Sequence, residues 1–309
     1  MSSWRELADR NRLLTHVPLG PLTTYKLGGP ARLLVEVEDA DDLVSLAGGI
    51  AETPLPVLVL GRGSNVLISD RGFDGVVVHL GPGFSWVRWQ EGLVSAGGST
   101  SLPNLARTAA RAGQGSLEFY VGIPGSVGGA VRMNAGCHGS ETADVLETAD
   151  VFDLLDGTRS ARSPEDLDLG YRHSNLGDHE VVVSATFHTV PVEPAAAEGV
   201  MREVSRWRKE HQPGGTLNAG SVFKNPPGDA AGRIIDEVGL KGYRVGSVSV
   251  SHKHGNFFVA ERAATAQDVH DLVFAVREIV RERSGVELIP EIRFVGDFDD
   301  EPQPPPAED

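Results

Sequence analysis

The chain has 309 residues, a hydrophobic content of 40% and a formal net charge of −15. This length accommodates two or three compact domains, and the hydrophobic content is ordinary for a globular protein. The negative charge argues against a nucleic-acid-binding protein, because such proteins need basic surface to displace phosphate counterions. We therefore expect a packed, multi-domain protein that does not bind nucleic acid.

Cys137 is the only cysteine, which excludes an intramolecular disulfide. The N-terminal sequence MSSWRELADRNRLLTHV carries charges where a signal peptide would have its apolar core. No stretch approaches the roughly 18 uncharged apolar residues of a membrane span. We therefore expect a cytoplasmic protein that does not interact with a membrane.

The N-terminal two thirds of the sequence predicts short strands separated by glycine-rich turns, with one clear helix. Period-two alternation and turn residues indicate the strands, and apolar residues at helical spacing indicate the helix. The predicted elements in chain order are a strand, a glycine turn and a strand over residues 57–80, a helix over 100–113 closed by Gly113, a hairpin over 151–163 turning at Asp156-Gly157, and a half-buried strand over 181–190.

Beyond residue 198 the pattern becomes mainly helical, and we place a domain boundary there. The C-terminal sequence DDEPQPPPAED holds five acids and no base, and its proline content is typical of disorder. The predicted helices are one around Val204 and Trp207, one over residues 229–238 stopped by Gly239, and one with Val269, Leu272, Val273, Val276, Ile279 and Val280 on one face, ended by Gly285.

Two glycine clusters, GRGSN at residues 61–65 and GIPGSVGGA at residues 122–130, are candidates for binding a pyrophosphate. Glycine lets the backbone approach a ligand closely, and consecutive N–H groups can form a concave anion site. Neither cluster is a Rossmann fingerprint, and the chain has no Walker lysine motif. Taken alone, each cluster is better explained as an ordinary tight turn. Both together, among alternating strands, favour a dinucleotide.

Residues 201–255 form a basic segment in an acidic chain, with nine Lys/Arg against five Asp/Glu and a net charge of +4. The segment is either a chance cluster on a solvated face or the binding site of an anionic ligand.

Three short motifs contain side chains suited to catalysis: LGYRHSNL, AGSVFKNP and ELIPEIRF. Each side chain also has an ordinary explanation, as a surface ion pair, a turn cap or a solvated strand residue. His252 and His254 lack a third ligand at metal spacing, so we expect no metal site. The candidates are Tyr171, Arg172, Ser174, Ser221, Lys224, Glu287, Glu291 and Arg293.

Eight motifs resemble, in the same order, those of the UDP-N-acetylenolpyruvoylglucosamine reductases, the MurB flavoenzymes of peptidoglycan precursor synthesis. The resemblance extends from about residue 22 to residue 295. The motifs are TTYKLGGPA, GRGSNVLISD, GIPGSVGGAVRMNAG, GYRHS, AGSVFKNP, GLKGYRVG, HKHGNFFV and PEIRF.

The resemblance implies an α+β fold, in which an FAD-binding domain pair of the PCMH or vanillyl-alcohol-oxidase type is followed by a C-terminal α+β substrate-binding domain. It implies non-covalent FAD, NADPH as electron donor, and a role in cell wall biogenesis, cell shape and cell division. The implied division is 1–80 and 81–198 for the two FAD-binding subdomains, 199–295 for the substrate-binding domain, and 296–309 for a disordered acidic tail.

The resemblance also implies the roles of individual residues. Arg172 would stabilise charge on the substrate, Ser221 would donate a proton to carbon, and Glu291 would share a proton with the carboxylate or orient the arginine. The FAD-binding residues would be Gly61, Arg62, Gly63, Ser64, Asn65, Gly122, Ile123, Pro124, Gly125, Ser126, Gly128 and Gly129. The residues binding the UDP-sugar would be Tyr171, Lys224, Asn225, Lys253, His254 and Asn256.

The chain departs from the longer type of this family, because the 48 residues between Arg172 and Ser221 leave no segment like its tyrosine-bearing lid. We assign it to the shorter type. A diverged enzyme acting on another enolpyruvyl or sugar substrate, and a flavin oxidase of the same superfamily, remain alternatives. So does a non-catalytic binding module, although it would have no reason to keep Arg172, Ser221 and Glu291 together. The sequence does not indicate an oligomeric state.

Overall fold

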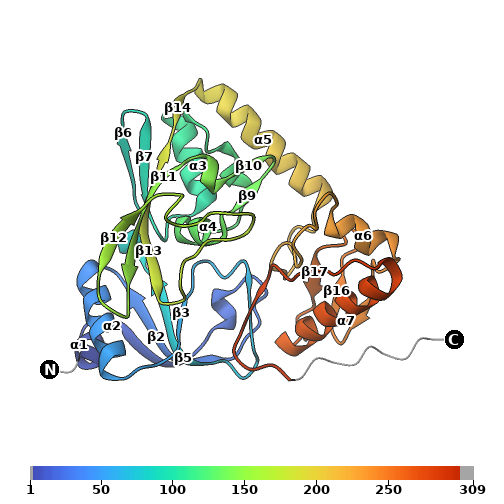
Figure 1. The fold of residues 1–309 in the computed structure, drawn as a ribbon, viewed down its shortest axis with the longest axis horizontal. Helices are drawn as coiled ribbons and strands as arrows, with labels where there is room; N and C mark the ends of the chain where they lie inside the picture. Colours follow the sequence, from blue (N-terminus) through green and yellow to red (C-terminus); the bar gives the residue numbers. More distant parts are fainter. Residues whose placement is uncertain (1–2, 300–309) are drawn as a thin grey trace. The chain divides into compact units, whose positions relative to one another are not determined.

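A computed structural model describes residues 3–299 of the chain, which divides into two compact units (Figure 1). The first unit comprises Met1–Val17, Arg32–Arg62 and Asp74–Arg208. The second comprises Pro18–Ala31, Gly63–Phe73 and Lys209–Asp309. Each unit is therefore assembled from three separate stretches of sequence.

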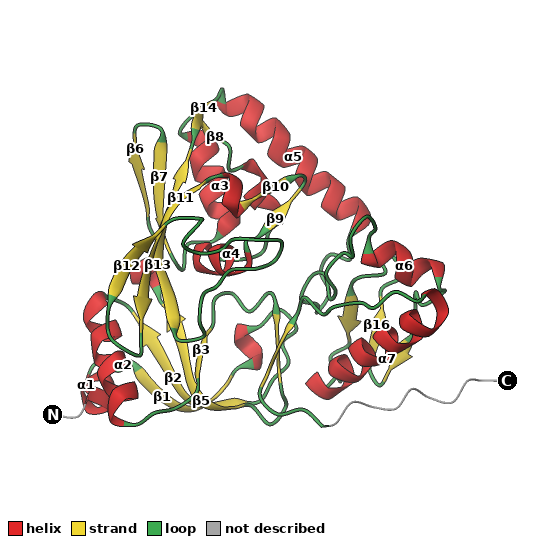
Figure 2. Ribbon diagram, viewed as in Figure 1, coloured by secondary structure: helices red, strands yellow, loops and turns green. Residues whose placement is uncertain are grey.

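A four-stranded sheet in the order β1-β2-β5-β3 forms one part of the first unit, with β3 parallel to β5. Two N-terminal helices accompany it, and they pack against each other (Figure 2). Asp39 caps the second helix, since its carboxylate accepts a hydrogen bond from Asp42 N at 3.0 Å. The bounds are β1 Leu13–Pro18, β2 Pro30–Val37, β3 Val57–Val59, β5 Phe73–Leu80, α1 Ser3–Asp9 and α2 Ala40–Glu52.

A five-stranded antiparallel sheet in the order β12-β11-β13-β7-β6 forms the other part of the first unit. The predicted hairpin is confirmed as β11 and β12, with Gly157 at φ +71° in its turn. The predicted strand over 181–190 is confirmed as β13, which is buried on both faces in its first half and alternates only in its second. The bounds are β6 Val87–Gln90, β7 Leu93–Gly97, β11 Leu146–Asp153, β12 Arg159–Arg162 and β13 Glu180–His188.

Helices α3 and α4 pack with this sheet in one hydrophobic core. The predicted helix is confirmed as α3, and its apolar residues Leu102, Leu105, Ala106, Ala109 and Ala110 are all buried. Helix α4 begins inside the second glycine cluster and was not predicted. Smaller elements complete the unit. The bounds are α3 Leu102–Arg111, η3 Glu118–Gly122, α4 Val127–Met133, β8 Gln114–Gly115, β9 Gly136–Cys137, β10 Ser140–Glu141 and β14 Val190–Pro191, with one-turn 3₁₀ helices η2 Pro82–Phe84 and η4 Thr142–Asp144.

The predicted helix around Val204 is part of the longer helix α5, Pro194–His211, which continues unbroken through residue 198. One division between the two compact units falls between Arg208 and Lys209, near the C-terminal end of α5. The domain boundaries given by the sequence stay a prediction.

The second unit contains a three-stranded antiparallel sheet, β15-β16-β17, and helices α6 and α7 around one core. Both helices confirm predictions. α7 begins with a capping box between Thr265 and Asp268 and ends at Gly285, which is left-handed at φ +72°. The bounds are η1 Gly20–Leu22, α6 Ala231–Glu237, β15 Arg244–Val245, β16 Val248–Val250, β17 Phe258–Ala260 and α7 Ala266–Ser284.

Strand β4, Val66–Ile68, also belongs to the second unit, where it pairs in parallel with β18, Arg293–Val295. The sequence predicted strands on both sides of the glycine turn at residues 61–65. It did not predict that β3 and β4 join different sheets. The local sequence does not indicate that β3 pairs with β5 and β4 with β18.

The predicted disorder of the 296–309 tail is wrong for its first four residues. The Phe298 ring stacks on His270 with centroids 4.7 Å apart, and Asp299 N donates to the Gln267 side chain at 3.0 Å. Residues 300–309 lie outside the described residues. Within residues 3–299, no helix has the length and apolar composition needed to span a membrane.

Candidate active site

The two glycine clusters meet in the first unit. A Cβ placed on Gly61 would lie 2.8 Å from Ser126 Oγ, so a side chain at position 61 would collide with the second cluster. Ser126 is 3% exposed and caps α4, its Oγ accepting a hydrogen bond from Gly129 N at 3.4 Å. The structure therefore brings together glycine loops that are about 65 residues apart in sequence, as a dinucleotide-binding interpretation requires.

The rest of the first cluster belongs to the second unit. Gly63 has φ +60°, and a Cβ there would lie 2.3 Å from Leu22 O, so only glycine fits. Asn65 Nδ2 donates to Glu291 O at 3.1 Å, and Arg293 N donates to Asn65 O at 3.1 Å. Asn65, predicted to bind flavin, thus also holds the backbone of the candidate catalytic glutamate.

Asn134 connects α4 to the turn that carries Arg172, and the sequence analysis missed it. It is fully buried, with the left-handed φ of +40°, and forms the C-cap of α4. Its Nδ2 donates to Gly170 O at 3.0 Å and its Oδ1 accepts from Ala143 N at 2.9 Å. The MNAG sequence that ends the helix was the only available signal.

Arg172 lies in a tight turn closed by hydrogen bonds between Gly170 and His173, at 3.2 Å and 3.1 Å. Its φ of +53° is uncommon for a residue with a side chain and stores backbone strain, which the surrounding bonds must offset. Its guanidinium donates to Gly136 O at 2.9 Å and lies over the Tyr171 ring at 5.1 Å. The turn therefore fixes the direction of a permanently cationic group.

Replacing Asn134 by glycine is expected to lower kcat with little change in KM. Glycine adopts the left-handed conformation without strain, so the change removes only the hydrogen bonds to Gly170 and Ala143. Two half-buried partners lose their bonds, and we expect unfolding to become easier by about 0.5–1.5 kcal/mol for each. Steady-state kinetics and thermal melting would measure both effects. Ser174→Ala, which removes one bond to Arg132 O at 2.7 Å, is the control with a smaller expected effect. An unchanged kcat in Asn134→Gly would refute the positioning role.

Ser221 and Glu291 lie on neighbouring extended segments of the second unit. Ser221 forms a bridge with Phe257, and Glu291 N donates to Val222 O at 2.7 Å. Lys224 N donates to Ile289 O at 2.9 Å, which continues the contact along both segments. The structure thus brings the serine and glutamate of the predicted triad onto one framework, while Arg172 belongs to the first unit.

Two asparagines of the predicted substrate-binding set hold the backbone around Ser221. Asn256 is 2% exposed; its Oδ1 accepts from Phe223 N at 2.9 Å and its Nδ2 donates to Phe223 O at 2.8 Å. Asn225 Oδ1 accepts from Ala231 N at 3.1 Å at the start of α6. Whether either asparagine contacts the substrate stays a prediction. Their hydrogen bonds also give them a role in positioning the backbone.

His254 is held as a neutral imidazole. Burial, the nearby Lys241 charge and His211 lower its pKa below the ordinary 6.5. Its Nδ1 lies 3.2 Å from Asn256 N, which places an acceptor there and the ring proton on Nε2. His254 can therefore offer an N–H donor to a ligand, though not a positive charge at neutral pH.

The stability contributed by His254 is expected to be fully present above pH 6.5 and to be lost as pH falls through the lowered folded pKa. In that range the unfolded state binds more protons than the folded state, so acid favours unfolding. Thermal melting between pH 5 and pH 8 measures this, and we expect His254→Gln to flatten the acid side of the curve. His252→Gln, at an exposed position two residues away, is the control. An identical pH dependence in wild type and His254→Gln would contradict the assignment.

Several cations of the basic segment are engaged by ion pairs or hydrogen bonds within the second unit. Lys241 pairs with Asp236 at 2.6 Å, and Arg244 pairs with Glu261 at 2.7 Å. Lys253 Nζ donates to Lys209 O at 2.5 Å. By contrast, no hydrogen bond or ion pair to another described residue occupies the half-buried ammonium of Lys224. The ammonium of Lys224 is thus available to a ligand.

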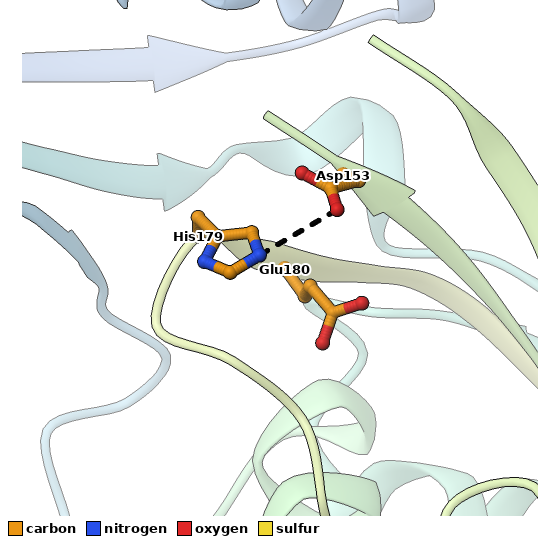
Figure 3. Close-up of side chains that lie close together, drawn as sticks. All are labelled: Asp153, His179 and Glu180. Atoms are coloured by element: carbon orange, nitrogen blue, oxygen red, sulfur yellow. Dashed lines mark ion pairs between the residues drawn. The ribbon is translucent and has the colours of Figure 1, made fainter. Parts of the chain in front are cut away.

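Among residues 3–299, one group could supply three metal ligands: Asp153, His179 and Glu180 (Figure 3). His179 Nε2 lies 3.5 Å from Asp153, as the dashed line shows. Glu180 accepts hydrogen bonds from Gly177 N at 2.6 Å and from the Arg162 guanidinium. Burial would raise the pKa of Glu180, but these two bonds outweigh it and the pKa is lowered. An arginine already neutralises the carboxylate, so the group is explained as an ion-pair network.

Comparisons with known proteins identify both parts of the chain. Residues 31–160 match the family model for an FAD binding domain. Residues 212–295 match the model for the C-terminal domain of UDP-N-acetylenolpyruvoylglucosamine reductase.

More than nine tenths of the chain also matches curated and solved proteins named UDP-N-acetylenolpyruvoylglucosamine reductase. The protein of Acidiphilium cryptum is 43% identical over 298 residues, 96% of each chain. That of Rubrobacter xylanophilus is 44% identical over 282 residues, 91% of this chain and 94% of the relative. The crystal structure of the Thermus caldophilus enzyme, MurB, aligns with a TM-score of 0.78 and 39% identity, covering 92% of this chain and 98% of that one.

The fold and the matched FAD binding domain define an FAD-dependent oxidoreductase with NADPH as reductant. Its architecture is the predicted α+β combination of FAD-binding and substrate-binding parts. The chain belongs to the UDP-N-acetylenolpyruvoylglucosamine reductase family. Its reaction is the reduction of UDP-N-acetylglucosamine enolpyruvate to UDP-N-acetylmuramate in peptidoglycan synthesis.

Proposed function

We propose that Arg172, Ser221 and Glu291 are the catalytic residues of this reduction. The observation that carries the proposal is the hydrogen bond from Glu291 N to Val222 O at 2.7 Å, which holds the serine and glutamate segments together. The strained turn at Arg172, with φ +53°, supports a functional role for the arginine.

Bound FAD supplies the hydride that adds to the substrate's enol ether. The substrate carboxylate is conjugated to this double bond, so negative charge develops on the carboxylate and the neighbouring carbon. Arg172 is permanently charged and presents a fork of N–H donors, which suits it to stabilise that charge. Glu291 shares a proton with the carboxylate or orients the arginine.

Ser221 completes the reaction by donating its hydroxyl proton to the carbon. A hydroxyl is a weak acid, but the developing carbanion is a strong base, so the serine needs no histidine partner. This role distinguishes Ser221 from a hydrolase nucleophile, for which a GxSxG turn and a histidine would be expected.

The two glycine clusters fit a flavin dinucleotide, since Gly61 and Ser126 approach too closely for any side chain at position 61. We propose that residues 61–65 and 122–129 hold its pyrophosphate and adjoining parts. We further propose residues 1–80 and 81–198 as FAD-binding subdomains and 199–295 as the substrate-binding domain. Helix α5 runs across the boundary at residue 198.

Lys224→Ala is expected to raise KM for both the UDP-sugar and NADPH, because each carries phosphate groups and Lys224 has an ammonium available to a ligand. Loss of a charged hydrogen bond of about 1.5–3 kcal/mol corresponds to an increase of roughly ten- to a hundredfold. Steady-state kinetics with each substrate varied in turn would measure it. Lys241→Ala is the matched control, since the ammonium of Lys241 is already ion-paired with Asp236. Unchanged KM values for both substrates would refute the contact.

The remaining contacts are also part of the proposal. Tyr171, Lys253 and His254 are the other side chains that we propose to meet the UDP-sugar, together with Asn225 and Asn256. Tyr171 is 47% exposed, so its ring is accessible to a ligand. We propose that the protein acts in the cytoplasm, on a small molecule and not on nucleic acid.

One experiment tests the function directly. The purified yellow protein is reduced anaerobically with NADPH, UDP-N-acetylglucosamine enolpyruvate is added, and the visible flavin absorbance is followed. Rapid return of colour establishes the reductase. Reduction without reoxidation would favour a diverged enzyme with another substrate. Flavin that stays attached after denaturation would favour the oxidase alternative, and protein that cannot be reconstituted with FAD would favour a binding module.

Cys137 argues against covalent attachment of flavin through its thiol. Burial raises the pKa of Cys137 to about 11, and Sγ donates to Phe119 O at 3.2 Å. A reactive cysteine needs its thiolate, and this thiol stays protonated near neutral pH.

A further inference from the structure

Helices α3 and α5 of the first unit line an open pocket of about 320 Å³ that lies outside the residues proposed for the reductase reaction. None of its lining residues is among those proposed for flavin, substrate or catalysis. The volume is within the range of small-molecule sites. The lining consists of Arg107, Arg111, Val121, Glu198, Met201, Arg202 and Ser205.

The charge of this pocket is opposite to that of the whole chain. Three arginines and one glutamate give its lining a net charge of +2, in a protein of net charge −15. Such a local excess of positive charge attracts anions. Arg202 and Glu198 form only a long ion pair, at 3.6 Å.

Arg107 and Arg111 have no ion pair or hydrogen bond from their side chains to any residue within 3–299. They are four residues apart on α3, so they lie one turn apart on the same face of the helix and repel each other. Elsewhere in the described chain many arginines are paired with acids, as Arg233 is with Asp229 and Glu237. Two neighbouring unpaired guanidinium groups at a pocket are a ready-made site for a planar or tetrahedral oxyanion.

The floor of the pocket is apolar. Val121 and Met201 are 8% and 7% exposed, and they present hydrocarbon beside the arginines. Ser205 adds a hydroxyl that can donate one hydrogen bond. A ligand here would therefore place its charge against α3 and Arg202 and its uncharged part on Val121 and Met201.

We propose that this pocket binds a small polyanion bearing a diphosphate, either as free pyrophosphate or as part of a nucleotide. Phosphate oxygens match the forked donors of arginine, and two linked phosphates carry enough charge to engage Arg107, Arg111 and Arg202 together. The pocket lies within the first unit, and its lining includes none of the residues proposed for flavin, substrate or catalysis.

The test is calorimetric titration of the FAD-loaded protein with pyrophosphate at 0.15 M salt. We expect saturable binding that weakens roughly tenfold or more in Arg107→Ala and in Arg111→Ala, since each change removes a charge-assisted hydrogen bond. Glu198→Gln is expected to strengthen binding, because it removes the only acid of the lining. Arg206→Ala, on α5 and outside the lining, is the matched control and should leave binding unchanged.

The outcomes separate this pocket from the substrate site. Binding that is unaffected by Arg107→Ala and Arg111→Ala, or that is lost in Lys224→Ala, would overturn the proposal, as would no saturable binding. Repeating the titration with ADP and UDP distinguishes the sources of the anion. Tighter binding of a nucleotide than of pyrophosphate, again lost in Arg111→Ala, indicates that Val121 and Met201 receive a base or sugar. Equal affinities indicate recognition of the diphosphate alone.

Discussion

Ser221→Ala is expected to leave flavin reduction by NADPH at the wild-type rate and to slow reoxidation by the enolpyruvyl substrate about 10²–10⁴-fold. The first half-reaction needs no proton from this serine, whereas the second ends when a proton reaches carbon. Alanine fits the backbone of the segment between Phe257 and Glu291, so the fold is expected to be unchanged. Anaerobic stopped-flow absorbance separates the two half-reactions.

Two further variants make this result specific to the hydroxyl. Ser221→Cys replaces one weak acid by another and is expected to recover part of the reoxidation rate, since a thiol with an ordinary pKa near 8.5 can donate a proton. Ser249→Ala changes a half-buried serine on β16 of the same unit and should behave as wild type. Reoxidation by Ser221→Ala at the wild-type rate would exclude the serine as proton donor.

Arg172→Lys is expected to lower kcat about 10²–10³-fold, the loss typical of removing one donor that stabilises developing negative charge. Lysine keeps the positive charge but lacks the forked, planar donor set, so the effect tests geometry and not charge alone. The substrate is held by many other contacts, and we expect KM to change much less. Steady-state kinetics would measure the split.

The control for this variant lies in the same turn. His173→Ala removes an exposed side chain whose nearest acid, Asp168, is 3.7 Å away, so it should leave kcat unchanged. If Arg172→Lys retained full kcat, or if His173→Ala lowered kcat equally, the turn would matter for folding and not for chemistry. Thermal melting of both variants checks that the comparison is made on folded protein.

Local patterns predicted the elements whose signals are contained within a few turns of chain. Helix α7 has apolar residues at helical spacing, a capping box and a terminal glycine, and all three indicate the same helix. The hairpin of β11 and β12 follows from Asp156-Gly157, a turn sequence with its own backbone preference. The resemblance to the MurB family supplied the catalytic residues, which spacing alone did not single out.

Elements that depend on distant partners could not be predicted in this way. Helix α4 is short and glycine-rich, so its intrinsic propensity is low, and it depends on the Ser126 cap and on burial of its apolar residues. In sequence, Asn134 is typical of an ordinary helix C-cap. Only the fold places its Nδ2 atom 3.0 Å from Gly170 O. The separation of β3 from β4 likewise depends on a strand more than 220 residues later.

The discontinuous make-up of the second unit means that its C-terminal portion is not an autonomous folding module. A fragment beginning at Lys209 would lack β4, the only strand paired with β18 among the described residues, and would leave that strand with an open edge. It would also lose the Asn65 bond to Glu291 and the buried Tyr25, whose phenol donates to Phe258 O at 3.0 Å. During synthesis, residues 18–31 and 63–73 are made long before their partners, so the framework around Ser221 and Glu291 is completed only when the last hundred residues have left the ribosome.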